Sequence, residues 1–142
     1  MPQWCEGAPR CSIGAMKTGT KPLQVLLVDD SDTFLAALRE YVEDFPQIIV
    51  AATAKRGEQA VALAGQLSPD LVLMDLDMPG IGGIEATRII KSLPRRPLVA
   101  VVTLHDAPEM RRAGLDAGAD FFMVKSRLHE EFPGMLARIA AR

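Results

Sequence analysis

Acidic residues stand directly after short apolar runs at two places in the chain, and this arrangement is the first sign of chemistry. Asp29 and Asp30 follow one run, and Asp75 follows another. Carboxylates brought close together raise one another's pKa unless a positive charge compensates them. A hard divalent cation such as Mg²⁺ accepts oxygen ligands of this kind, and a carboxylate can also attack phosphorus. The three residues therefore suggest a metal site with a phosphoryl acceptor, provided the fold gathers them.

A hydroxyl and an ammonium group follow two further apolar runs, at Thr103 and Lys125. Both can neutralise the charge that spreads over phosphoryl oxygens during transfer. A simpler interpretation is that the acidic pair only caps the following helix. A cap explains one acidic residue, but it leaves Asp75, Thr103 and Lys125 at matching positions without an explanation.

Five short apolar runs must position these side chains, at residues 23–28, 48–52, 71–74, 98–102 and 121–124. Runs without polar alternation predict strands covered on both faces, as in a parallel sheet. Helical patterns separate them: one helix capped by Ser31, others at 57–67, 83–93 and 128–141, and one that Pro108 begins and Gly118 ends. Alternating strands and helices predict an open α/β sheet, whose strands all direct their carboxyl ends to one edge.

The bulk composition narrows the class of protein. The 142 residues fit one domain, and the formal net charge of −2 gives no reason to expect direct contact with nucleic acid. No apolar run approaches the roughly 20 residues of a membrane span, so we expect a cytoplasmic protein without a membrane partner. We expect residues 1–21 to be a flexible leader, native or added for expression, with Cys5 and Cys11 as reduced thiols, and residues 22–142 to form the domain.

Four segments together resemble the receiver domains of two-component response regulators. They are Val-Leu-Leu-Val-Asp-Asp-Ser at 25–31, Asp-Leu-Asp-Met-Pro-Gly at 75–80, Val-Val-Thr at 101–103 and Phe-Met-Val-Lys at 122–125. The resemblance covers about residues 23–142 and implies a flavodoxin-like (βα)5 fold, doubly wound, with strand order 2-1-3-4-5. In that order the first and third strands flank the point where ligands bind.

The resemblance also implies roles for individual residues. Asp75 is the phosphoryl acceptor. Asp29 and Asp30 hold Mg²⁺ (or Mn²⁺) together with Asp75, and the backbone carbonyl of Asp77 completes the protein ligands. The chain would then be a phosphoacceptor and not an enzyme, apart from its own phosphorylation and dephosphorylation.

Three further residues are implied to respond to the phosphoryl group. Thr103 binds a phosphoryl oxygen, Lys125 pairs with Asp75 and then with the phosphate, and Phe122 is the aromatic residue that switches position. The implied donor is the phosphohistidine of a sensor histidine kinase or of a histidine phosphotransfer protein. The implied recipient of the signal is a downstream protein partner or an output domain, and a homodimer also fits.

Departures from the family pattern concern the loops around the site. Ser126 follows the lysine where most receivers have proline, so the Lys125–Ser126 bond is trans, or cis at a cost of roughly 2.5–4 kcal/mol. This serine, and Thr-Leu-His-Asp at 103–106, resemble receivers joined to helix-turn-helix output domains of the NarL/LuxR type. Transcription regulation is therefore one implied output.

Other departures affect the lifetime of the phosphate and the signalling face. Leu104 is bulky where a small residue is commoner, and Asp77 and His105 occupy positions that usually tune hydrolysis. Pro133 lies within the last helical pattern, where proline removes a hydrogen bond. We expect that helix either to kink there or to begin near Pro133.

Two alternatives remain at this stage. The Asp75-Leu76-Asp77 segment also looks like the Asp-x-Asp of haloacid-dehalogenase-like phosphatases. In those enzymes, however, the other acidic residues come later in the chain, and this chain is short for them. The second alternative is a receiver-shaped binding module that is never phosphorylated.

Overall fold

Strands and helices alternate throughout the part of the chain that the computed structural model describes, residues 21–78 and 81–141. The elements are β1 (Leu23–Val28), α1 (Asp32–Glu43), β2 (Ile48–Ala54), α2 (Gly57–Leu67), β3 (Leu71–Asp75), α3 (Gly82–Lys91), β4 (Leu98–Thr103), α4 (Pro108–Asp116), β5 (Phe121–Val124), a 3-10 turn (Lys125–Arg127) and α5 (Leu128–Ala140). The predicted leader with Cys5 and Cys11, and Pro79 and Gly80, lie outside the described residues.

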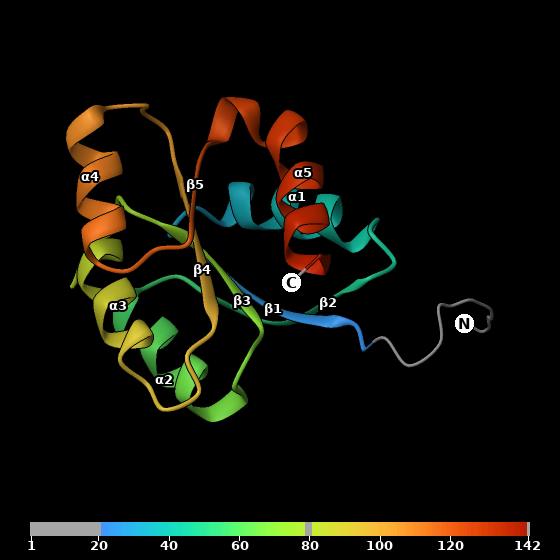
Figure 1. The fold of residues 1–142 in the computed structure, drawn as a ribbon, viewed down its shortest axis with the longest axis horizontal. Helices are drawn as coiled ribbons and strands as arrows, with labels where there is room; N and C mark the ends of the chain where they lie inside the picture. Colours follow the sequence, from blue (N-terminus) through green and yellow to red (C-terminus); the bar gives the residue numbers. More distant parts are fainter. Residues whose placement is uncertain (1–20, 79–80, 142) are drawn as a thin grey trace.

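The five strands form one parallel sheet in the order β2-β1-β3-β4-β5, as predicted. Helices α1 and α5 cover one face, and α2, α3 and α4 cover the other (Figure 1). The prediction that every strand is covered on both faces holds only in part for β2, whose Ile48 packs in the layer under α1 and α5 and whose Ala54 packs in the layer under α2. That strand lies at the edge of the sheet, and Ile49 on it is 44% exposed.

Alternation of side chains along the strands divides the core into two layers. Leu27 and Leu73 belong to the layer under α1 and α5, where the fully buried Phe132 also packs. Val28 and Met74, the next residue of each strand, belong to the layer under α2, α3 and α4. The central strands are therefore packed on both faces, which fixes the position of their carboxyl ends.

Local signals set the start of α1 and both ends of α4, as expected. The Ser31 side chain accepts a hydrogen bond from the Phe34 N–H at 3.2 Å and so caps α1. Pro108 is the first residue of α4, and Gly118 follows the end of that helix with a φ of +105°, which glycine adopts readily. The predicted 83–93 helix is instead Gly82–Lys91, because Ser92 caps it and its hydroxyl donates to the Ile89 carbonyl at 2.6 Å.

The last helix does not begin near Pro133, which was one of the two forms predicted for it. Helix α5 begins at Leu128, so a start near Pro133 is wrong. Pro133 lies on the exposed face, while Phe132 and Met135 on the other face are buried and stabilise the helix despite the lost hydrogen bond.

The Lys125–Ser126 bond is trans, as are the other peptide bonds in residues 21–78 and 81–141. Within those ranges, no helix is long and apolar enough to cross a membrane.

Candidate functional site

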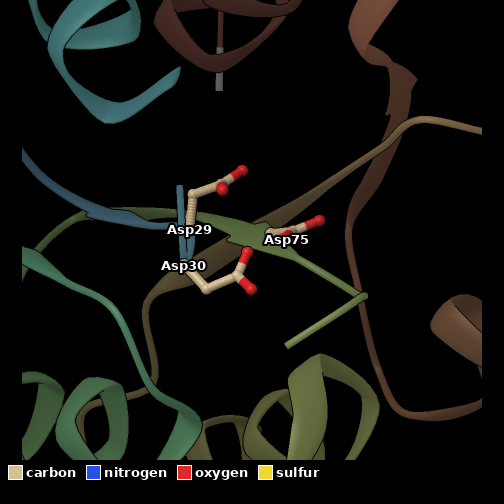
Figure 2. A group of neighbouring side chains, drawn as sticks. All are labelled: Asp29, Asp30 and Asp75. Atoms are coloured by element: carbon tan, nitrogen blue, oxygen red, sulfur yellow. The ribbon is translucent and has the colours of Figure 1, made fainter. Parts of the chain in front are cut away.

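The register between β1 and β3 brings the acidic residues together. Val28 pairs with Met74, so Asp29 and Asp75 follow side by side at the carboxyl edge of the sheet. One carboxylate oxygen from each of Asp29, Asp30 and Asp75 lies within 4.8 Å of the others. Figure 2 shows the three side chains gathered at this point. Asp29 and Asp75 are buried and Asp30 is exposed, so the cluster is open to solvent on one side.

The register of β3, β4 and β5 brings the hydroxyl and the ammonium group to the same edge. Asp75 pairs with Val102, and Thr103 pairs with Val124, which Lys125 follows directly. Thr103 is fully buried, and its hydroxyl oxygen accepts a long hydrogen bond of 3.5 Å from the His105 N–H. The structure therefore places the polar residues of four strands at one edge, which the alternation of strands and helices predicted.

Lys125 contacts a different carboxylate from the one expected. Its Nζ lies 2.7 Å from Oδ2 of Asp29 but 3.9 Å from Oδ1 of Asp75. The same ammonium group lies 4.1 Å from the centroid of the Phe34 ring on α1, a cation–π distance. Nothing in the sequence pairs Phe34 with Lys125, so only the structure shows this contact.

Asp75 is held in an environment that disfavours its charge. It is 3% exposed, and burial, followed by the negative charge of Asp29, raises its pKa from 3.8 to about 6. Lys125 and a 3.4 Å hydrogen bond from the Asp77 N–H act in the opposite direction but do not cancel the rise. Asp30 raises the pKa further by a smaller amount. The cluster thus carries more negative charge than the protein alone compensates.

The donor atoms fit a hard divalent cation. All three side chains offer carboxylate oxygens, the ligand type that Mg²⁺ prefers. Oδ1 of Asp29 accepts the Ser31 N–H at 2.9 Å, whereas its buried Oδ2 has no well-directed hydrogen bond within residues 21–78 and 81–141 and lies 2.7 Å from the Lys125 ammonium. A buried carboxylate oxygen with unused lone pairs, beside a second carboxyl group with a raised pKa, is suited to a metal ion.

Gly83 allows α3 to pack directly against the end of β3. A Cβ atom at this position would overlap the backbone oxygen of Asp75 and crowd the Cα of Leu76. The backbone at the end of β3 is therefore fixed by a contact that only glycine permits. The sequence pattern places Gly83 at the start of a helix but does not predict this contact, because the close approach depends on how the helix crosses the strand.

The residues predicted to tune the chemistry surround the site, and their roles stay predictions. Asp77 and His105 are exposed, and Leu104 is 61% exposed on the loop after β4. Phe122 is partly buried in the core layer under α4, on the same sheet face as Thr103. The guanidinium of Arg111, which sequence reasoning did not single out, lies 4.4 Å from the centroid of the Phe122 ring.

Known proteins are similar to this chain in sequence and in fold. Residues 25–136 match the family model of the response regulator receiver domain. Response regulator GacA of Pseudomonas aeruginosa is 37% identical over 120 residues, which are 84% of this chain and 56% of that protein. The nitrate/nitrite response regulator protein NarL of Escherichia coli is 34% identical over 123 residues, 85% of this chain and 56% of that protein.

A solved structure of a response regulator has the same fold as this chain. The two-component response regulator of the LuxR family from Aurantimonas sp. SI85-9A1 superposes with a TM-score of 0.79 and 32% identity, over 86% of this chain and 88% of that chain. The chain spans about half the length of the curated relatives it matches. With the strand order and the cluster of aspartates at the carboxyl edge, these matches show that the chain belongs to the response regulator receiver domains, with relatives of the NarL and LuxR type.

Proposed function

We propose that Asp75 accepts a phosphoryl group, with Asp29, Asp30, Asp75 and the carbonyl of Asp77 holding Mg²⁺. One observation carries the proposal: a buried carboxylate with a raised pKa stands beside two other carboxylates and a lysine at the edge of the sheet. When bound, the metal ion supplies positive charge that keeps the acceptor ionised and neutralises phosphoryl oxygens.

The transfer would proceed from a phosphohistidine of a sensor kinase or a histidine phosphotransfer protein. A carboxylate oxygen of Asp75 forms a bond to phosphorus while the bond between phosphorus and the histidine nitrogen breaks. That nitrogen keeps the electron pair and takes up a proton. The Lys125 ammonium, held near Asp29, would turn to the phosphoryl oxygens, and the buried Thr103 hydroxyl would donate to one of them. The domain acts as a signalling acceptor and not as an enzyme with turnover.

The output lies outside this domain in the proposal. Because the chain spans about half of GacA and NarL, we infer either an attached output domain or a separate protein partner. The NarL and LuxR relatives favour control of transcription. The phosphatase alternative has no support, because the acidic pair comes before Asp75 in the chain, directly after β1, and the family match is to receivers.

Acetyl phosphate or beryllofluoride with Mg²⁺ tests the proposal. We expect acetyl phosphate to add one phosphoryl group to the intact protein by mass spectrometry, and beryllofluoride to shift the NMR signals around the site. Both changes should disappear with a chelator and in Asp75→Asn, while Asp116→Asn, an exposed residue at the end of α4, should behave as wild type. If the wild type responds to neither reagent, the chain is instead a binding module that is never phosphorylated.

A further inference from the structure

The carboxylate of Asp106 joins three segments around the site. It lies on the loop between β4 and α4, three residues after Thr103. Its Oδ1 accepts a hydrogen bond from Arg111 Nη2 at 3.0 Å, and its Oδ2 accepts one from Arg127 Nη2 at 2.9 Å. One side chain thus ties its own loop both to α4 and to the 3-10 turn after β5.

The two arginines lie next to residues of the proposed switch. Arg111 is on α4, and its guanidinium stacks over the Phe122 ring at 4.4 Å from the centroid. Arg127 is two residues beyond Lys125, in the same 3-10 turn. The carboxylate of Asp106 therefore connects the loop after Thr103 with both the aromatic ring and the segment that carries the lysine.

The strength of this connection depends on its being a network. Each side chain is roughly half exposed, with side-chain exposures of 42% for Asp106, 46% for Arg111 and 47% for Arg127. A single exposed ion pair contributes little, but one carboxylate that binds two guanidiniums restrains both more effectively. Both hydrogen bonds lower the pKa of Asp106, so both arginines favour its ionised form.

We propose that Asp106 is a positioning residue, which through Arg111 and Arg127 holds the β4–α4 loop and Phe122 in the arrangement of the unphosphorylated domain. This inference rests on the proposed function, because the switch responds to a phosphoryl group on Asp75. A phosphoryl group that draws in Thr103 moves the loop and strains the Asp106 contacts. Contacts made in only one of two states shift the population toward that state, so the network opposes switching.

A matched set of variants tests the proposal without a phosphoryl analogue. We compare Asp106→Asn, Arg127→Gln, the double variant and Arg112→Gln by NMR of the Phe122 ring and of the amides of residues 104–107. Arg112 is the neighbouring arginine on α4 and makes no ion pair within residues 21–78 and 81–141, so its replacement controls for the positive charge that Arg127→Gln removes. We expect Asp106→Asn to move the Phe122 signals, Arg127→Gln to move the loop amides, and Arg112→Gln to leave both in place.

Two further measurements distinguish a positioning role from a merely structural one: rescue by Asp106→Glu and the affinity for beryllofluoride. Asp106→Glu keeps the charge and should restore the wild-type signals. Because only one of two states would lose contacts, Asp106→Asn should also bind beryllofluoride with Mg²⁺ about 2- to 10-fold more tightly than wild type. The double variant should match Asp106→Asn, because Arg127 has then already lost this partner.

The outcomes distinguish this inference from the proposed function. The positioning role is overturned if the NMR signals of Phe122 in Asp106→Asn stay at their wild-type positions, as they should in Arg112→Gln. It is also overturned if wild type binds beryllofluoride and Asp106→Asn binds it with the same affinity. If wild type does not bind beryllofluoride at all, the phosphoacceptor function fails. Coupled shifts of Phe122 and the loop, reversed by Asp106→Glu, would still support the network in that case.

Discussion

Replacing Asp75 with asparagine should stabilise the metal-free protein at neutral pH, although it removes the proposed acceptor. The substitution keeps the shape of the side chain and removes its charge. In the folded protein, burial and the charge of Asp29 disfavour that charge and raise the Asp75 pKa from 3.8 to about 6. A carboxylate with a raised folded-state pKa costs stability wherever it is ionised in both states.

The size and pH dependence follow from this shift. A rise from 3.8 to about 6 is worth about 3 kcal/mol at most, since each pKa unit corresponds to about 1.4 kcal/mol. Because the amide must itself be hydrogen-bonded when buried, we expect Asp75→Asn to raise the free energy of unfolding by about 1–3 kcal/mol at pH 7. The advantage should be full above pH 6, shrink as the wild type takes up a proton between pH 6 and 3.8, and vanish below 3.8.

Urea denaturation with a chelator at a series of pH values measures the effect, with the exposed Asp116→Asn as the control. Addition of Mg²⁺ should then remove most or all of the variant's advantage. A ligand that binds only the folded state stabilises it by about 2.7 kcal/mol at 100 times its dissociation constant, and the variant should lose most of that gain. The reasoning is refuted if chelated Asp75→Asn is no more stable than wild type at pH 7, or if Mg²⁺ stabilises both proteins equally.

Three other substitutions test the packing and the electrostatics of the same region by urea denaturation. Gly83→Ala should destabilise by about 1–3 kcal/mol because its Cβ overlaps the β3 backbone, whereas Gly65→Ala, with open space around it, should stabilise by up to about 1 kcal/mol; equal effects would contradict the close approach. Lys125→Met should cost about 3 kcal/mol by removing the positive charge beside the buried carboxylate of Asp29, and Mg²⁺ should recover part of the loss; a loss that Mg²⁺ does not affect would argue against a metal at this carboxylate. Phe132→Ala should cost about 3–5 kcal/mol because its ring is fully buried, and a cost under 1 kcal/mol would mean that α5 is not held by this side chain.

The order and periodicity of the apolar runs predict the parallel sheet and the edge of it at which the site lies. Continuous apolar runs separated by helical patterns require a parallel sheet, and a parallel sheet has all its carboxyl ends on one side. That rule brings Thr103 and Lys125 to the same edge as the aspartates. The grouping of Asp29, Asp30 and Asp75 also requires β1 and β3 to be neighbours, which the strand order implied by the family resemblance supplies.

The contacts between individual charged groups, in contrast, become visible only in the folded chain. Lys125 contacts Asp29 more closely than Asp75, and Asp106 binds Arg127, a residue 21 positions away. Such contacts depend on register, on rotamers and on the angle at which each helix crosses the sheet, and no periodic pattern encodes these. Tertiary packing also sets the start of α5. The helix begins at Leu128 and continues through Pro133, because burial of its inner face outweighs the local effect of the proline.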